Sequence, residues 1–449
     1  METEIGDLMD THGTRDAARR PVDHAVPAVD GSGAGSTDHG RAPTEEPTAL
    51  DRTLSLPMLI FYGVGVTVGA GIFALVGEIV DIAGVRAPLA FLVSGAIAGL
   101  TGLCYAQLIA RYPRAGGEAV YVTNGLGRSA GRVAGLGVVV TGTISSAVIS
   151  LAFAGYLRDI VVAPEALFAV LIIVALAAVA ARGVRESVAL AAAITVLEVG
   201  TLVVVAAVGV PTLADAGDEL MTNLAVWRDG PSFSAVFAGA VVAFFAFVGF
   251  EDLANMAEET VDARRNGPRS IVITLIITLV VYVVLALVAV AAPNRDELVE
   301  SSAPMATLFE TLTGRDGRVI SAIAVVAMVN GVLVQIVMAS RVLYGMANEG
   351  LVPPAFGVVN ERRRTPMRAT FSVAAAIIVL AVAFPLVGLA RATSVVTLGV
   401  FALVDASLVV IALRTRRTDP DLLKWAWVGA VGAVAAVALA GRELMELVR

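Results

Sequence analysis

The amino-acid sequence predicts an all-α protein that crosses a membrane many times. Hydrophobic residues make up 57% of the 449 residues and charged residues only 16%, against roughly 45–50% and about 25% in soluble domains. The apolar residues gather in runs of about 20, the length needed to cross a hydrocarbon core of about 30 Å. Together these observations exclude an ordinary soluble enzyme.

The first 53 residues contain no such run. They hold eleven Asp or Glu against five Arg and are rich in Gly and Pro, so they cannot bury enough surface to offset the entropy of ordering. We therefore expect residues 1–53 to form a disordered acidic cytoplasmic tail, and they lack the basic start and apolar core of a signal peptide. A regulatory or partner-binding arm is the alternative interpretation of this tail.

Eleven apolar runs separated by short polar connections predict about eleven transmembrane helices. The third and eighth are too long for one perpendicular crossing, so we expect them to tilt or to extend into water. The predicted helices cover residues 54–81, 87–110, 117–157, 163–182, 187–210, 233–259 (interrupted), 267–292, 317–347, 368–389, 392–413 and 424–441.

The orientation follows from the basic residues in the connections between these helices. Alternate connections, beginning with the N-terminal tail and counted together with the helix ends beside them, hold 23 of the 32 Lys and Arg, and the opposite set holds nine. Because basic residues stay on the cytoplasmic side of a cell membrane, we expect the N-terminus inside. With eleven crossings, the C-terminus then lies outside.

The few cysteines and histidines of the chain exclude intramolecular disulfide bonds and several kinds of metal and catalytic site. The single cysteine, Cys104, permits no intramolecular disulfide or cysteine-based metal cluster. His12, His24 and His39 all precede the first apolar run, so no imidazole is expected within the membrane. We therefore expect no catalytic residue, no metal, no cofactor and no enzymatic activity.

The first predicted helix contains four glycines in nine residues, within the stretch from Gly63 to Phe73 (GVGVTVGAGIF). If the helix unwinds at 69–71, the N–H groups that begin its second half carry partial positive charge and form a carboxylate site. Thr67 lies beside this break. The alternative is close helix packing of the small-xxx-small kind, whose spacing Gly65 and Gly69 match.

The sixth predicted helix places Gly249 just before two acids, Glu251 and Asp252, inside an apolar span. Ionisable groups at that depth cost at least ~2.5 kcal/mol and normally face water, a partner or a substrate. An unwound turn at 247–249 would free backbone carbonyls, which suit an ammonium group. The two breaks together predict a site for a zwitterion such as an α-amino acid.

The interrupted helices are the first and the sixth, five spans apart. Transporters built from two inverted repeats place broken helices at corresponding positions, at the midplane where substrate binds. The sequence thus predicts a five-plus-five inverted-repeat transporter fold. We expect residues 54–414 to form its ten-helix transport core and residues 415–449 to add a connection and one further helix.

Five stretches, in this order, resemble motifs of the amino acid–polyamine–organocation permeases, and the resemblance runs from about Leu54 to Arg414. They are GAGIF at 69–73, YPRAGGEAVY at 112–121, RGVRES at 182–187, FAFVGFE at 245–251 and ASRVLYGM at 339–346.

The resemblance implies alternating-access transport and assigns roles to individual residues. The family's first-helix motif falls on Gly69, Ala70, Gly71 and Ile72, whose backbone would hold the carboxylate. Its sixth-helix motif falls on Phe245, Ala246, Phe247 and Val248, which would supply carbonyls for the amine; Phe245 would also form an aromatic gate, with simple apolar packing as the alternative. The complete predicted substrate site is Thr67, Gly69, Ala70, Gly71, Ile72, Phe245, Ala246, Phe247, Val248 and Gly249.

The chain also departs from this family. Many relatives have twelve helices, whereas only one helix follows the core here. Glu198 stands where several relatives carry a lysine, and Asp405 stands where a small polar residue is common. We predict proton coupling by Glu251 and, second, by Glu198, because protonation removes the cost of a charge in apolar surroundings. The alternative is that these acids are neutral or paired structural groups.

The sequence therefore predicts a secondary transporter of α-amino acids, with proton symport as the coupling. An amino acid or polyamine exchanger would share every motif, and a non-transporting membrane sensor would keep the fold. Three phenylalanines near the sixth-helix break favour neutral or apolar substrates, while Glu251 keeps a cationic one possible. The expected partners are an amino acid, a proton and the lipid bilayer, with no nucleic acid.

Overall fold

The described part of the chain is helical, and no β-strand occurs in it beyond two isolated bridges. The computed structural model describes residues 52–113, 117–162, 164–183, 188–217, 233–348, 350–360, 363 and 365–447. The predicted tail therefore lies outside the described residues apart from Arg52 and Thr53.

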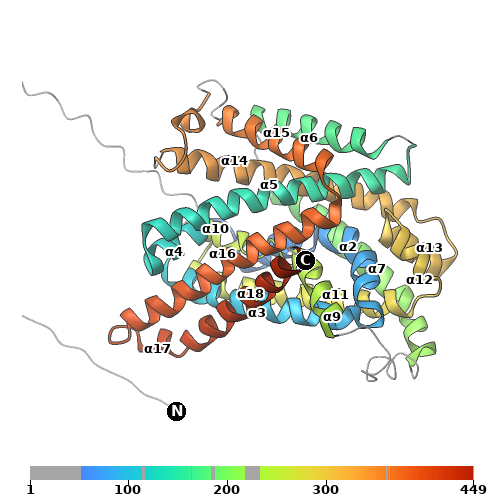
Figure 1. Cartoon of the computed structure of the whole chain (residues 1–449), viewed down its shortest axis with the longest axis horizontal. Coiled ribbons are helices and arrows are strands. Elements are labelled where there is room, and N and C mark those ends of the chain that lie inside the picture. Colours follow the sequence, from blue (N-terminus) through green and yellow to red (C-terminus); the bar gives the residue numbers. More distant parts are fainter. Residues whose placement is uncertain are drawn as a thin grey trace, which may run out of the picture. The chain divides into compact units, whose positions relative to one another are not determined.

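The long helices run in roughly one direction across Figure 1, with α4 and α17 near one end and α12 and α13 near the other. In chain order the helices are α1 (Leu56–Val68), α2 (Ala70–Ala83), η1 (Gly84–Arg86), α3 (Ala87–Arg111), α4 (Gly117–Leu126), α5 (Arg128–Arg158), α6 (Glu165–Arg182), α7 (Val188–Asp215), α9 (Phe233–Phe245), α10 (Asp252–Asn255), η2 (Ala257–Glu259), α11 (Ala263–Ala291), α12 (Arg295–Glu300), α13 (Pro304–Thr313), α14 (Arg318–Asn348), η3 (Pro354–Gly357), α15 (Met367–Ala383), α16 (Leu386–Arg414), α17 (Pro420–Leu423) and α18 (Ala426–Leu447).

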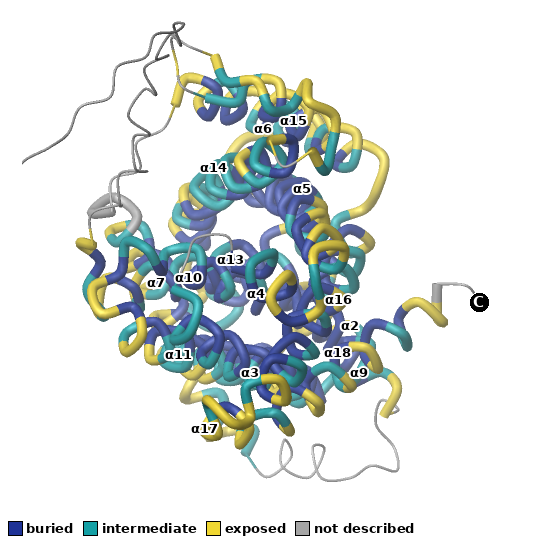
Figure 2. Tube along the Cα trace, turned by 90° about the vertical axis from the view of Figure 1, so that its left-hand side faces the viewer, coloured by how far each residue is buried: buried dark blue, intermediate teal, exposed yellow. Residues whose placement is uncertain are grey.

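Length and composition qualify eight helical runs of the described chain as membrane spans, and one of these runs, Ala70–Arg111, contains both α2 and α3. Three shorter apolar helices, α1, α9 and α15, add to them. Buried residues line the inner faces of the helices and exposed residues the outer faces (Figure 2). Outward-facing apolar side chains such as Leu171 and Val174 of α6 suit contact with lipid. The predicted all-α polytopic fold is confirmed.

Both predicted interruptions are present. Gly69 separates α1 from α2, and the turn at 246–251 separates α9 from α10. Because these are the first and the sixth spans, the chain has the predicted pair of broken helices. The bounds of α1 with α2 and of α9 with α10 show that each break lies within an otherwise apolar helical span.

Two helix boundaries differ from the prediction, each for a backbone reason. The predicted span 117–157 divides at Gly127, whose φ of 96° lies in the left-handed region that glycine tolerates. The predicted boundary at 389–392 instead falls at Phe384 and Pro385, because a residue before proline favours extended backbone; Phe384 has φ −131° and ψ 146°. The short α12 and α13 occupy a connection for which no helix was predicted.

The final helix, α18, packs against α16 and α3. A Cβ on Gly432 would lie 2.5 Å from Oδ2 of Asp405, and one on Gly429 would lie 2.7 Å from the Asp405 carbonyl oxygen. Oδ2 of this fully buried Asp405 also accepts a hydrogen bond from Thr101 at 2.9 Å. Asp405 therefore sits in the contact between the helices, which favours the structural interpretation of this acid.

Candidate functional site

The break in the first span leaves a helix N-terminus without a side-chain cap. Gly69, with φ −43° and ψ −137°, precedes α2, and no side chain accepts from the first N–H groups of that helix. The Thr67 hydroxyl donates to the Gly63 carbonyl at 2.7 Å, so it is satisfied within α1. The first turn of α2 therefore retains backbone donors and the positive end of the helix dipole.

The break in the sixth span is a series of tight turns. The amides of Ala246, Phe247 and Val248 each donate to a carbonyl three residues earlier, at 3.0, 3.0 and 3.1 Å. Gly249 follows with φ 129°, a conformation that favours glycine. Within the described chain, the carbonyls of Phe247 and Val248 accept no hydrogen bond. This turn therefore offers acceptors, as the sequence predicts.

The two breaks touch through their backbones. A Cβ on Gly71 would lie 2.6 Å from Cα of Ala246, and a Cβ on Gly249 would lie 2.9 Å from the carbonyl oxygen of Val66. Both distances are too short for any side chain. Only glycine at these two positions permits the observed contact between the spans.

Tyr282 of α11 connects the same two breaks. Its hydroxyl lies 2.9 Å from the Thr67 carbonyl oxygen and 2.8 Å from that of Ala246, and the side chain is fully buried. Its ring contacts Phe247 with centroids 5.2 Å apart. Sequence analysis missed this residue, although a tyrosine within the apolar run 267–292 was the available signal.

The two interpretations of the first-helix glycines apply to different residues. A Cβ on Gly65 would lie 1.9 Å from Oγ1 of Thr195 on α7, so Gly65 is a helix-packing glycine. A Cβ on Gly69 would instead meet only the Gly65 and Val66 carbonyl oxygens of its own chain segment, at 3.6 and 3.7 Å. Gly69 therefore serves the break and not a helix contact.

The predicted substrate residues converge on this contact, but they differ in exposure. Gly69 and Val248 are partly exposed, so one residue of each break borders open space. The remaining predicted substrate residues are buried; they are Thr67, Ala70, Gly71, Ile72, Phe245, Ala246, Phe247 and Gly249.

The two interrupted spans are also joined at one end. The amides of Thr53 and Leu54 both donate to the Glu259 carbonyl at 3.0 Å, and the Val261 amide donates to the Leu54 carbonyl at 3.0 Å. The chain entering α1 is thus hydrogen-bonded to the chain leaving the sixth span. Movement of one span at this end has to break these bonds or carry the other span with it.

Glu251 and Glu198 lie in different surroundings. Glu251 precedes α10, and its Oε2 accepts a hydrogen bond from the Gly249 amide at 2.8 Å. Glu198 of α7 is 2% exposed, and its Oε2 has no hydrogen-bond partner among the described residues. It lies close enough to Tyr282 for its charge to act on that hydroxyl. Glu251 is therefore hydrogen-bonded to the second break, whereas Glu198 is related to the breaks only through its electrostatic effect on Tyr282.

A third acid near the breaks was not predicted as functional. Glu118 of α4 is 3% exposed, accepts a hydrogen bond from the Tyr105 hydroxyl at 3.0 Å and lies within electrostatic range of Glu251. The signal was its place in the motif at 112–121, to which the sequence analysis assigned no residue role. No group of three His, Cys, Asp or Glu suited to a metal ion occurs among the described residues.

A polytopic all-α membrane protein whose first and sixth spans break against each other belongs to the class of broken-helix transporters. A model of the amino acid permease family matches residues 54–441. The chain therefore belongs to the amino acid permeases, within the amino acid–polyamine–organocation superfamily, and it is an amino acid transporter.

Individual relatives agree with this assignment. The chain is 32% identical over 399 residues to an uncharacterised transporter of Mycobacterium tuberculosis. This aligned region covers 87% of each chain. It is 28% identical to the mitochondrial cationic amino acid transporter 3 of Arabidopsis thaliana, over 81% of this chain and 62% of the relative. It is 24% identical to a branched-chain amino acid permease of Bacillus subtilis, over 85% and 84%.

Proposed function

We propose that this permease binds one α-amino acid between its two helix breaks, carries it by alternating access and takes up a proton with it. The observation that carries the proposal is that an uncapped α2 N-terminus lies beside the carbonyls of Phe247 and Val248, which accept no hydrogen bond within the described chain. A carboxylate is favoured at the first of these groups, and an ammonium group is a matching donor for the second.

Backbone groups placed in this way would bind the carboxylate and the ammonium group, which all α-amino acids share. The side chain of the substrate is then left to the groups around the break, which include the aromatic rings of Phe245 and Phe247 and the carboxyl of Glu251. The named relatives include a cationic and a branched-chain amino acid transporter. We favour a neutral or apolar substrate, because aromatic side chains outnumber acids at the break.

Proton coupling rests on the positions of Glu251 and Glu198. Glu251 is hydrogen-bonded to the break itself, so a change in its charge alters the Gly249 amide and the turn around it. Glu198 has no partner for Oε2 among the described residues, and binding of a proton would remove the charge of this buried carboxylate. A carboxylate that must be neutral in one state and charged in another couples proton binding to the conformational change.

The direct test is uptake of labelled amino acids into proteoliposomes with an imposed pH or sodium gradient. We expect an inward proton gradient to drive accumulation, and Glu251→Gln and, more weakly, Glu198→Gln to reduce it. Glu258→Gln, which changes a carboxylate near the end of the same segment, is the matched control and should accumulate substrate normally. All variants should retain exchange, because exchange requires no net proton movement.

Three other outcomes each contradict part of the proposal. Dependence on a sodium gradient, with no response to pH, rules out proton coupling. Uptake that requires amino acid on the inner side identifies an exchanger. Binding without any flux identifies a sensor.

A further inference from the structure

A polar cavity that is partly open to solvent lies away from the helix breaks. It has a volume of about 350 Å³ and is lined by the end of α6, the last part of α14 and the start of α15, and its arginines are exposed. These three helices lie together in both views of the molecule (Figures 1 and 2). Three arginines line the cavity: Arg182, Arg341 and Arg363.

These arginines lack the partners that other arginines of the chain have. Arg111 and Arg158, for example, are paired with carboxylates. By contrast, none of the three guanidinium groups in the cavity makes an ion pair or hydrogen bond with a residue in the described part of the chain, and no described acidic residue lines the cavity. Three cations that share one cavity repel one another, so an anion would relieve this repulsion.

The hydroxyl groups of the cavity are already engaged as donors. Ser340 donates to the Val337 carbonyl at 3.0 Å, Thr365 to that of Ala181 at 2.9 Å and Thr370 to that of Pro366 at 3.1 Å. The donors left for a ligand are therefore those of the guanidinium groups. Their planar fork matches the oxygens of a phosphate in bidentate geometry.

The first turn of α15 contributes a second favourable element. Thr365 and Pro366, which come just before α15, and Thr370 of its first turn line the cavity, so the N-terminus of a 17-residue helix borders it. A helix N-terminus favours an anion. Two independent features, the unpaired arginines and the helix end, thus select for negative charge.

We propose that this cavity binds a phosphate group, separately from the amino acid site. In the topology proposed from the basic residues, it opens at the cytoplasmic side, where basic pockets between membrane helices hold anionic lipid headgroups. The neighbouring outer faces of α6 and α15 carry exposed apolar side chains, including Val179 and Phe371. The same chemistry is found in a lipid headgroup and in a soluble phosphate, and the volume admits either.

Thermal unfolding of the purified full chain in detergent separates these two sources. One arm adds phosphatidylglycerol, with phosphatidylcholine of the same acyl chains as its control, and the other adds inorganic phosphate at constant ionic strength. Ligand binding to the folded state raises the melting temperature, and we expect phosphatidylglycerol to raise it by roughly 2–4 °C. An equal rise with inorganic phosphate alone would identify a soluble anion as the ligand.

The double variant Arg182→Gln, Arg341→Gln should lose this response. The matched control is Arg295→Gln, Arg368→Gln, which removes the same charge from two exposed arginines that do not line the cavity and should respond as the wild type does. The single variant Arg363→Gln serves if the double variant does not fold. Stabilisation by amino acids should persist in every variant, which distinguishes this site from the proposed transport site.

The proposal is overturned if neither phosphatidylglycerol nor phosphate stabilises the wild type. It is also overturned if the double variant keeps the response, or if the control loses it to the same extent. The last outcome would show that general positive charge, and not this cavity, attracts the anion.

Discussion

Tyr282 is the residue whose hydroxyl oxygen lies within hydrogen-bond distance of both broken spans. Its hydroxyl has a single proton but lies within hydrogen-bond distance of two carbonyl oxygens, those of Thr67 and Ala246. It can therefore donate to only one of them at a time. The other carbonyl needs a second donor, which a substrate ammonium or a water molecule could supply. Tyr282 thus links the geometry of both breaks to what is bound between them.

We predict that Tyr282→Phe weakens amino acid binding and lowers stability by about 1–3 kcal/mol, because it leaves buried carbonyls without their donor. Substrate binding and the melting temperature of the purified variant are the measurements. Tyr121→Phe is the matched control, since the buried Tyr121 hydroxyl has no hydrogen-bond partner among the described residues. Unchanged substrate affinity in Tyr282→Phe would show that this hydroxyl does not serve the site.

We predict that Gly71→Leu abolishes amino acid binding while the protein still inserts and folds. The first carbon of the new side chain would lie 2.6 Å from Cα of Ala246, so it forces the two breaks apart at the place where the carboxylate is proposed to bind. Overpacking of this kind costs about 1–3 kcal/mol. Gly99→Leu is the control, because nothing lies within 4 Å of a Cβ at Gly99. Wild-type affinity in purified Gly71→Leu would contradict the proposed site.

At the scale of helices, the sequence predicts those features that arise from neighbouring residues in the chain and misses those that arise from contacts between distant residues. Both breaks could be predicted, because Gly69 and Gly249 act on their own backbone. The bridge through Tyr282 could not, since its partner Thr67 lies 215 residues away in the chain. Pro385 was a local signal that hydrophobicity obscured, because the apolar run continues past it on both sides.

The acids show the same division between local and distant causes. Glu251 could be predicted to matter because it follows Gly249 within one apolar span. The proximity of Glu118 to Glu251 depends on how α4 packs near the sixth span, and one sequence contains no signal for that contact. The proton-coupling roles of Glu251 and Glu198 stay predictions.

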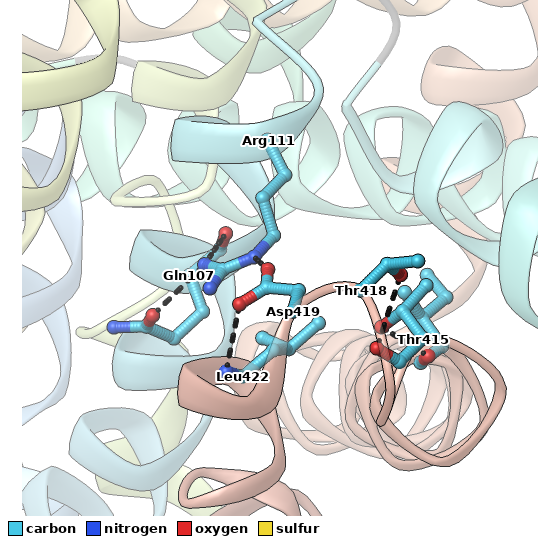
Figure 3. A network of polar contacts seen from close by, with 7 residues as sticks. Gln107, Arg111, Thr415, Thr418, Asp419 and Leu422 are labelled. Atoms are coloured by element: carbon cyan, nitrogen blue, oxygen red, sulfur yellow. Dashed lines mark hydrogen bonds and ion pairs between the residues drawn. The ribbon is translucent and has the colours of Figure 1, made fainter.

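Another contact between elements joins α3 to the connection before α18 (Figure 3). Arg111, the last residue of α3, donates through Nε to Oδ2 of Asp419 at 2.6 Å, and Oδ1 of Asp419 accepts from the Leu422 amide at 3.1 Å. Arg111 is itself held by Gln107 through two 3.0 Å bonds. Asp419 therefore both caps α17 and fixes the end of α3.

This ion pair predicts a pH dependence of stability. The hydrogen bond from Arg111 holds the pKa of the Asp419 carboxyl below its ordinary value, which is about 3.9. A lowered pKa in the folded state adds stability above pH ~4, and this contribution disappears as the pH falls through the folded value. The pair is partly exposed, so the expected contribution is less than about 1 kcal/mol.

We expect Asp419→Asn to lower the melting temperature by a constant amount between pH 8 and about 5, by a shrinking amount once the pH falls below about 4, and not at all below the lowered pKa of the folded state. Asparagine still caps a helix, so the loss reports the charge and not the cap. Asp421→Asn, which changes an exposed carboxylate two residues away, should have a smaller effect. A difference that grows toward acid pH would contradict the assigned direction of the pKa.

At the scale of the whole molecule, α18 decides where the chain ends relative to the membrane. Its 22 residues correspond to about 33 Å of helix, enough to cross a hydrocarbon core of about 30 Å. Near its end, Glu443 lies 3.5 Å from Arg391, close to the start of α16. The two helices therefore run in opposite directions, and α18 returns to the side from which α16 began.

We predict a cytoplasmic N-terminus and an external C-terminus, because 23 of the 32 basic residues fall in connections, or in the helix ends beside them, on the side of the N-terminus. Topology reporters fused before Met1 and after Arg449 should report opposite sides in intact cells. A fusion that ends after Arg417, before α17 and α18, is the internal control and should report the cytoplasm. If the full-length C-terminal fusion is also cytoplasmic, α18 does not cross; if all three fusions are inverted, the distribution of basic residues does not set the orientation.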